Sequence, residues 1–321
     1  MNYDIIGDIH GHAAALRALL ASLGYAETQG AWRHPERQAL FVGDFIDRGP
    51  QQVETVDIVR RMTDAGSAQA VLGNHEFNAI AWYLPDPEHP GEYLRPHHSA
   101  KYGEKNFRQH QAFLAEVNGT PRHKEIIDWF LSLPLWLDLS DIRVVHACWH
   151  QRFMDYLKPK LAPGNRLTPE LMVDASREPT DEREKDTAEA SVFKAVEALT
   201  KGIEIPLPSG KTFKDEDGHE RRRVRSRWWD RAATTYPDAA LLDRDTCSTL
   251  PVDSIPDHAI LDDSSGKPTF IGHYWLDGTP AVLSAGTACV DYSIAKGGKL
   301  VAYRWDGEPA LDDSRFHWVG Q

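Results

Sequence analysis

Cysteine is scarce in this 321-residue chain, which contains only three. Cys148, Cys247 and Cys289 lie far apart and form no Cys-x-x-Cys pair. An odd number of widely spaced cysteines indicates neither a disulfide framework nor a zinc site built from thiolates.

Long apolar runs are also missing. No stretch of about 18 apolar residues occurs, which excludes a membrane-spanning helix. The segment at residues 1–7 has no basic stretch leading into a long apolar one, so it does not resemble a secretion signal. We therefore expect a soluble cytoplasmic protein that does not associate with membranes.

Basic residues are outnumbered, with 36 Lys and Arg against 48 Asp and Glu and a net charge of −12. An acidic surface argues against extended binding to nucleic acid or to anionic membranes. A small phosphorylated substrate remains compatible, because a local cluster of metals and arginines reverses the sign of the field.

The first 80 residues alternate predicted strands with predicted helices, which is typical of a largely parallel sheet. The predicted strands are 3–7, 39–43 and 68–72, and the predicted helices are 13–20 and 53–62. Later predicted elements are helices at 124–133 and 182–201 and strands at 135–139, 143–145, 269–271, 281–283 and 299–305. We expect one α/β domain over 1–321, with insertions at about 84–123 and 151–265, the second of them cap-like.

Polar clusters follow five of these predicted strands. Three are framed by glycine, and two are single histidines, His146 and His273; the framed clusters are Gly7-Asp8-Ile9-His10-Gly11, Gly43-Asp44-Phe45-Ile46-Asp47-Arg48-Gly49 and Gly73-Asn74-His75-Glu76. A Gly-Asp pair after one strand is usually only a turn, and one histidine is usually a structural residue. Repetition at five strand ends favours a functional site instead, because parallel strands place those ends along one edge of a sheet.

The residue types in these clusters suit a metal. Asp8 and His10 are two positions apart, so in extended chain their side chains project the same way. Carboxylate, imidazole and amide ligands without thiolate fit Mn²⁺, Fe or Zn²⁺. Open coordination positions for water and substrate would make such a site catalytic.

The order of these motifs resembles the calcineurin-like metallophosphoesterases, and in particular their phosphoprotein-phosphatase branch. The resemblance is specific over 4–83, fair over 125–150 and 268–308, and weak elsewhere. It implies a β-sandwich flanked by helices, with two divalent metals at the strand ends. Mn²⁺ is the expected ion, with Fe or Zn²⁺ as alternatives. The metals would convert a shared water to a bridging hydroxide and stabilise the phosphoryl transition state. The implied ligands are Asp8, His10 and Asp44 for the first metal, and Asp44, Asn74, His146 and His273 for the second.

The same resemblance assigns roles to the neighbouring polar residues. His75 matches the general acid that protonates the leaving oxygen, Asp47 the carboxylate that orients it, and Arg48 a phosphate clamp. Alternatively, Asp47 and Arg48 pair with each other within the loop. Trp275 stands where many relatives have a second histidine ligand, as expected for the phosphoprotein-phosphatase branch.

A basic stretch at 221–229 stands out in an acidic chain. It resembles the Arg-x-x-Trp segment of the phosphatase modules of polynucleotide kinase-phosphatases, which matches Arg225 and Trp228. Arg225, and after it Arg227, are therefore candidates for binding substrate phosphate. The alternative is a solvated basic stretch with an aromatic anchor.

Taken together, the motifs predict a hydrolase that acts on phosphate monoesters of phosphoprotein or nucleotide type. Symmetrical dinucleoside-tetraphosphatases and PrpE-type enzymes are similar in motif order, so tetraphosphatase activity is an alternative. A scaffold with a degenerate metal site is a further alternative, and the presence of all six expected ligands argues against it. The insertion at 151–265 could also recruit a protein partner.

Overall fold

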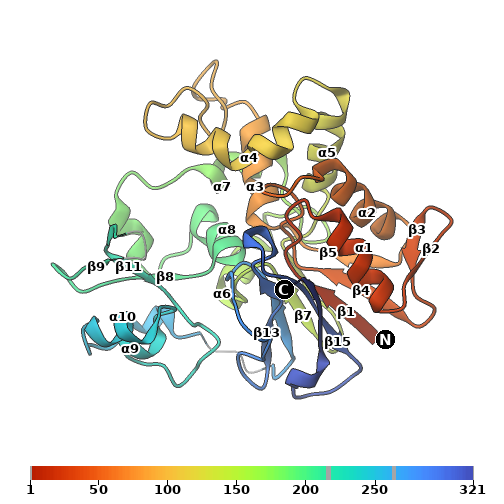
Figure 1. Ribbon diagram of the computed structural model, residues 1–321. Coiled ribbons are helices and arrows are strands. Elements are labelled where there is room, and N and C mark those ends of the chain that lie inside the picture. The colour runs from red at the N-terminus through yellow and green to blue at the C-terminus, as the bar shows by residue number, and fades with distance from the viewer. Residues whose placement is uncertain (1, 215–217, 262–264, 321) are drawn as a thin grey trace.

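Two β-sheets form the centre of the computed structural model, which describes residues 2–214, 218–261 and 265–320 (Figure 1). The first sheet has the strand order β14-β15-β1-β4-β5, and β16 pairs with β15. Its strands are β1 (Asn2–Ile6), β4 (Arg37–Phe41), β5 (Ala68–Ala70), β14 (Asp291–Tyr292), β15 (Lys299–Trp305) and β16 (Phe316–Gly320). The strands β1, β4 and β5 are parallel, whereas β14, β15 and β16 join antiparallel. The sheet is thus parallel only where the chain alternates strand and helix.

The second sheet has the order β13-β12-β7-β6. Its strands are β6 (Trp136–Asp138), β7 (Arg143–Val145), β12 (Thr269–Ile271) and β13 (Thr287–Cys289). Both β7 and β13 run parallel to β12, so the ends of β7 and β12 lie at the same edge.

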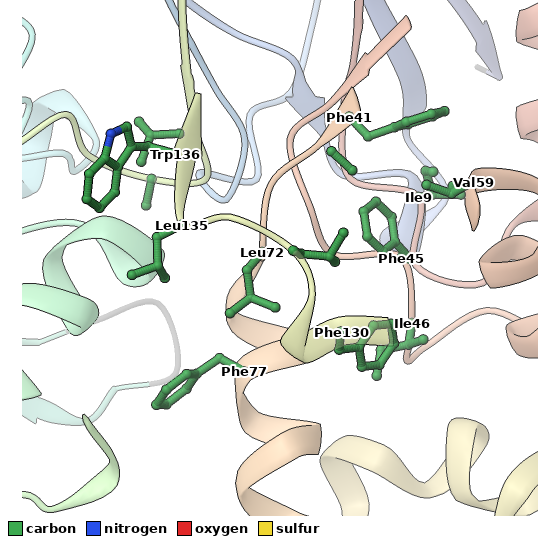
Figure 2. Packing of buried hydrophobic residues seen from close by; sticks show 14 of the residues in the cluster. Ile9, Phe41, Phe45, Ile46, Val59, Leu72, Phe77, Phe130, Leu135 and Trp136 are labelled. Carbon is green, nitrogen blue, oxygen red and sulfur yellow. The ribbon is translucent and has the colours of Figure 1, made fainter. Parts of the chain in front are cut away.

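The two sheets pack face to face through a shared apolar core. Ile5 and Leu40 from the first sheet and Val144 and Phe270 from the second belong to one cluster and are fully buried. Alternate side chains of the same strands point the other way, towards helices; Phe41, for example, joins the larger cluster shown in Figure 2. The predicted helix-flanked β-sandwich is therefore confirmed.

Helices cover the outer face of each sheet (Figure 1). The helices are α1 (Ala13–Ser22), α2 (Gln52–Asp64), α3 (Asn74–Tyr83), α4 (Gly103–Val117), α5 (Pro121–Leu131), α6 (Gln151–Leu157), α7 (Pro169–Ser176), α8 (Val192–Lys201), α9 (Tyr236–Ala239) and α10 (Arg244–Thr249). The helices α1 and α2 lie on the first sheet, and Leu199 of α8 accepts a backbone hydrogen bond from Ala147 (2.9 Å), which directly follows β7. None of the helices in the described part of the chain combines the length and apolar character that a membrane crossing requires.

The second predicted insertion contains a small core of its own. Ile205, Val224, Tyr236 and Ala240 are among the buried residues of a separate apolar cluster within residues 205–259. Two hairpin-like pairs contribute to this region: β8 (Glu204–Pro206) with β11 (Arg223–Arg225), and β9 (Phe213–Lys214) with β10 (Glu220–Arg221). Residues 215–217 and 262–264 of this insertion lie outside the described residues.

Two predicted elements are wrong. The expected helix at 182–201 is broken into a short 3₁₀ helix, η1 (Glu182–Asp186), and α8, because Ser191 caps α8 by accepting from the Lys194 backbone N–H (3.2 Å). The expected strand at 281–283 is irregular, and the strand lies at β13. The backbone N–H of Val282 donates to Asp313 Oδ1 (2.7 Å) instead of to a strand neighbour.

Candidate metal centre

Five loops at the carboxyl ends of β1, β4, β5, β7 and β12 bring the predicted ligands together. All six of these side chains are buried; they are Asp8, His10, Asp44, Asn74, His146 and His273. The parallel pairing of β1 with β4, of β4 with β5 and of β7 with β12 sets these loops at one end of the sandwich.

Asp44 lies at the centre of the cluster. Its Oδ2 atom is 3.5 Å from Nε2 of His146, 3.8 Å from Nε2 of His10 and 3.9 Å from Nε2 of His75. Two groups therefore share Asp44 and have ligand atoms within 4.8 Å of one another: one with His10 and His75, and one with His146 and His273. His10 and Asp44, which the sequence assigns to the first metal, lie in the same group, and the structure adds His75 to it.

Asn74 joins the two histidines that follow the second sheet. Its Oδ1 atom is 3.0 Å from Nε2 of His146 and 2.8 Å from Nδ1 of His273. Because Asn74 is the first residue of α3, the helix fixes the direction of this amide.

The outer nitrogens of two histidines are fixed by backbone carbonyls. His10 Nδ1 donates to Ile46 O (2.9 Å), and His146 Nδ1 donates to Val42 O (2.7 Å). Since a carbonyl only accepts, each Nδ1 carries a proton, and Nε2, the nitrogen that faces Asp44, is the one that would bind a metal. This is the arrangement in which histidine binds a metal.

The donor set fits divalent cations. Asp8 Oδ1, His10 Nε2 and His273 Nε2 are buried without a hydrogen-bond partner among the described residues. In addition, burial and the carboxylates of Asp291 and Asp44 raise the pKa of Asp8 well above its usual range. Buried lone pairs and crowded carboxylates are costly unless a cation neutralises them, so these residues match a metal site.

Asp8 reaches the cluster by a different route from the other ligands. Its Oδ2 accepts a hydrogen bond from the backbone N–H of His273 (3.0 Å). This contact joins the loop after β1 in one sheet to the loop after β12 in the other, and it leaves Oδ1 of Asp8 without a hydrogen-bond partner among the described residues.

His75 and Asp47 form a close buried pair. His75 Nδ1 lies 2.5 Å from Asp47 Oδ2, and Nδ1 of His110 lies 2.8 Å from the same oxygen. Burial opposes protonation of His75, but the carboxylates of Asp44 and Asp47 outweigh it and raise its pKa. Burial would raise the pKa of Asp47, yet His110 and His75 lower it to about 2. The pair can therefore hold a proton on His75 next to the metal cluster.

His110 and Glu76 are site residues that the motif reading missed. His110 belongs to α4 in the insertion at 84–123, where no recognisable motif marks it. Glu76 stands inside the Gly-Asn-His-Glu motif, which is a usable signal. Its carboxylate accepts from the backbone N–H of Asp44 (2.8 Å), Phe45 (2.8 Å) and Gly73 (3.1 Å), so it ties two ligand loops together.

Backbone conformation at the site is strained. Positive φ angles, uncommon for residues with a side chain, occur at five functional positions: His10 (47°), Asp44 (54°), Asp47 (71°), Arg48 (73°) and His273 (73°). Such strain persists only when surrounding contacts determine it, and it concentrates at functional sites. Gly73 is required for another reason, since a Cβ there would lie 2.2 Å from Asp44 Oδ1.

Arg48 is exposed at the edge of the cluster. Its guanidinium carbon lies 5.6 Å from the centre of the Trp275 ring, and Lys296 Nζ lies 4.6 Å from the same ring. The ring of Trp275 is also 5.6 Å from that of His10. Asp47 contacts His75 and His110, so the alternative in which Asp47 serves as the loop partner of Arg48 is not what the structure shows.

The structure brings Arg225 to the site. Burial, then the charge of Arg225, lowers the pKa of His273 well below its usual range, and the guanidinium carbon of Arg225 lies 6.0 Å from the Tyr274 ring centre. Trp228 acts as an anchor here, because its Nε1 donates to Tyr274 Oη (3.0 Å). Arg227 is held by a backbone hydrogen bond to Ala239 O (2.7 Å), and no contact in the described structure joins its side chain to the cluster.

A helix-flanked β-sandwich that gathers buried Asp, His and Asn ligands at its strand ends defines a metallophosphoesterase architecture. Sequence comparison agrees: the profile of the calcineurin-like phosphoesterase family matches residues 1–189. The chain belongs to this family.

Relatives were found at moderate identity. The chain is similar to the asymmetrical bis(5'-nucleosyl)-tetraphosphatase PrpE of Oceanobacillus iheyensis, with 30% identity over 148 residues that cover 46% of this chain and 55% of that protein. It is 33% identical over 150 residues to the enzyme of the same name from Bacillus velezensis, covering 46% of this chain and 56% of that protein. The chain thus spans about half the length of the curated relatives it matches.

Solved structures that align with this chain share little sequence identity with it. A serine/threonine phosphatase from Saccharomyces cerevisiae aligns with a TM-score of 0.48 and 14% identity over 100% of this chain and 79% of that one. A cold-active protein-tyrosine phosphatase from a Shewanella species aligns with a TM-score of 0.46 and 15% identity, over 96% and 78% of the two chains.

Proposed function

We propose that this protein is a metal-dependent phosphatase that hydrolyses phosphate monoesters of phosphoprotein or nucleotide type. The observation that carries the proposal is the convergence of three imidazole Nε2 atoms, within 3.5–3.9 Å, on Oδ2 of the buried Asp44. Family membership supports phosphoester chemistry at this cluster.

Two divalent ions would occupy the cluster, with Mn²⁺ as the expected metal. Asp8, His10 and Asp44 would hold the first, and Asp44, Asn74, His146 and His273 the second. When bound, such ions lower the pKa of bound water and stabilise the charge of the phosphoryl group in the transition state.

The protein side chains supply the remaining steps. The raised pKa of His75 favours its charged form, and Nε2, the nitrogen that faces Asp44, would donate its proton to the leaving oxygen. Asp47 orients the imidazole through the 2.5 Å contact with Nδ1. Arg48, exposed beside the cluster, offers a planar fork of donors to two phosphate oxygens, and Arg225 would add a second cation near His273. The position of Arg227 lends its proposed phosphate-binding role less support.

Dinucleoside-polyphosphate cleavage is a second candidate, because the relatives named above are tetraphosphatases. Their names specify the asymmetrical reaction, whereas the motif order suggested the symmetrical one. Both reactions use the same metal cluster, so the difference lies in what binds the leaving group.

Metal removal followed by a substrate panel tests the proposal. Chelator-treated protein is assayed with p-nitrophenyl phosphate, bis(p-nitrophenyl) phosphate and diadenosine tetraphosphate, before and after addition of Mn²⁺. We expect metal-dependent turnover, highest on the monoester, that falls by about 100-fold or more in Asp44→Asn. Asp128→Asn, an exposed change on α5, is the matched control and should retain activity.

Each alternative predicts a different result from the same panel. Preference for diadenosine tetraphosphate, with products resolved by chromatography, favours the tetraphosphatase reaction and shows whether cleavage is symmetrical. Absence of turnover with Mn²⁺, Fe²⁺, Zn²⁺ and Mg²⁺ on every substrate refutes the proposal and favours the scaffold.

A further inference from the structure

A cavity of about 400 Å³ lies between α3, α4, α7 and α8. Its walls come from the first turns after the metal-ligand motif of α3 and from both predicted insertions, at 84–123 and 151–265. Its volume lies in the range typical of small-molecule sites. None of the six predicted metal ligands lines this cavity.

One side chain connects this cavity to the candidate general acid. Gln109 lines the cavity, and its Nε2 lies 3.4 Å from Nδ1 of His75. The opposite end of the same amide, Oε1, accepts from Nη2 of Arg95 (2.6 Å). The cavity therefore adjoins the His75–Asp47 pair on the Nδ1 side of the imidazole, and an organic group attached to a phosphate at the metal cluster would extend past His75 into it.

Arg95 is a cation of this cavity that is available to a ligand. Its Nε is buried without a hydrogen-bond partner among the described residues, and the same holds for Ser176 Oγ on the facing helix. Burial lowers the pKa of Arg95 to about 10, against the opposing effect of Asp47. Burying a guanidinium that has no carboxylate partner costs free energy. A carboxylate or phosphate offsets this cost by accepting two parallel hydrogen bonds from its N–H groups.

The carboxylates in the cavity wall are already paired. Glu197 bonds to Lys201 (2.8 Å), and Glu178 pairs with Lys185. These pairs leave two cations in the wall, Arg95 and the exposed Lys105, and Arg95 is the one with a buried nitrogen that lacks a partner among the described residues.

The remaining lining is apolar. Phe77 is 6% exposed and packs into the main core, while Leu94, Pro96 and Phe193 face the cavity from other segments. Figure 2 shows Phe77 on the helix that carries the metal-ligand motif. An organic group with a flat or apolar body would pack against these side chains.

We propose that this cavity receives the leaving group of the substrate and that Arg95 binds a second anionic group carried by that leaving group. The inference rests on the proposed phosphatase function and narrows its substrate class: phosphate esters of organic alcohols or phenols that bear a carboxylate or phosphate of their own. Arg95 is thus a specificity-determining residue supplied by the insertion.

A pair of matched substrates tests this assignment. We would measure kcat/KM of the Mn²⁺-loaded enzyme for phenyl phosphate and 4-carboxyphenyl phosphate, in the wild type and in Arg95→Gln. Because leaving-group reactivity cancels when the two ratios are compared, the preference for the carboxylate should fall by about tenfold or more in the variant. Arg95→Lys keeps the charge without the fork and should restore part of the preference. Arg108→Gln, an exposed change on α4, next to Gln109 in the sequence, should leave the ratio unchanged.

Binding to metal-free protein separates this inference from the proposed function. By NMR titration, 4-hydroxybenzoate and 4-hydroxyphenylphosphonate should bind more tightly than phenol, and Arg95→Gln should abolish the difference. The tighter of the two anions identifies whether a carboxylate or a phosphate is recognised. Equal ratios in the wild type and Arg95→Gln, or equal binding of phenol and both anions, overturn the assignment. If no substrate is hydrolysed, the leaving-group role fails with the proposed function, and the titration still decides whether Arg95 binds an anion.

Discussion

At the scale of single residues, Glu76 shows how much of the centre depends on a side chain that binds neither metal nor substrate. Its carboxylate accepts backbone hydrogen bonds from both the Asp44 loop and Gly73. In Glu76→Gln, an NH₂ group would face backbone donors, which costs about 1–3 kcal/mol for each donor left unsatisfied. We expect a lower midpoint of urea unfolding and weaker Mn²⁺ binding by calorimetry. Glu54→Gln, an exposed change on α2, serves as the control, and equal effects of the two changes would contradict the role given to Glu76.

Trp275 is a second residue whose role is indirect. It stands where many relatives have a histidine ligand, and the cations of both Arg48 and Lys296 lie over its ring. Cation–π contacts at exposed sites contribute about 0.5–1 kcal/mol. Trp275→Ala should therefore raise KM for p-nitrophenyl phosphate by about two- to fivefold, with a smaller change in kcat, as steady-state kinetics would show. Trp318→Ala on β16 is the control; a loss confined to kcat would argue against a role in holding Arg48.

At the scale of elements, α8 depends on its cap. Ser191 Oγ accepts from the Lys194 backbone N–H, and α8 packs beside β7 through the Ala147–Leu199 hydrogen bond. Ser191→Ala should lower the free energy of unfolding by about 1 kcal/mol, measured by urea denaturation. Ser140→Ala, in an exposed turn, should have a smaller effect, and identical midpoints for both variants would show that the cap does not stabilise α8.

Elements were predictable where local signals and the tertiary fold agree. The helix after β1 follows from a run of strong helix formers and the helix after β4 from apolar residues at helical spacing, and the ligand loops follow from glycine-framed polar clusters. The prediction of one helix over residues 182–201 was wrong because Ser191, inside a helical pattern, caps a new helix. The prediction of a strand at residues 281–283 was wrong because backbone groups there bond to distant side chains such as Asp313. His110 on α4 and Arg95 in the segment before α4 carried no local signal, since only tertiary packing brings them to the site.

At the scale of the whole molecule, a buried charge network joins the two ends of the chain. Asp4 on β1 is fully buried and accepts from Arg37 Nε (3.0 Å) and from Arg304 Nε (3.0 Å) on β15. Removing one partner of such a group leaves an uncompensated charge, so Asp4→Ala should lower the free energy of unfolding by about 3–5 kcal/mol. Urea denaturation would measure this loss, and a value near that of the exposed control Asp64→Ala would contradict it.

Asp306, which pairs with Arg37 at the edge of this network, predicts that stability depends on pH. The hydrogen bond from Arg37 and the charge of Arg315 lower the pKa of Asp306. A carboxyl group with a lowered folded-state pKa stabilises the fold above its unfolded value of about 3.9 and loses that contribution as the pH falls through the folded value. The stability difference between the wild type and Asp306→Asn should be constant above about pH 5 and shrink towards pH 2. A difference that persists undiminished at pH 2 would exclude this linkage.

The contact between Asp8 and the backbone of His273 spans 265 positions of the chain. The centre therefore cannot assemble during synthesis until β12 and the turn after it have left the ribosome, even though four of the six ligands emerge within the first 74 residues. A chain truncated before His273 would retain the Gly-framed motifs yet lack both the ligand and the backbone donor that completes the pocket around Asp8. A prematurely terminated chain would therefore be an inactive fragment. It would not be a weakly active phosphatase with an incomplete metal site.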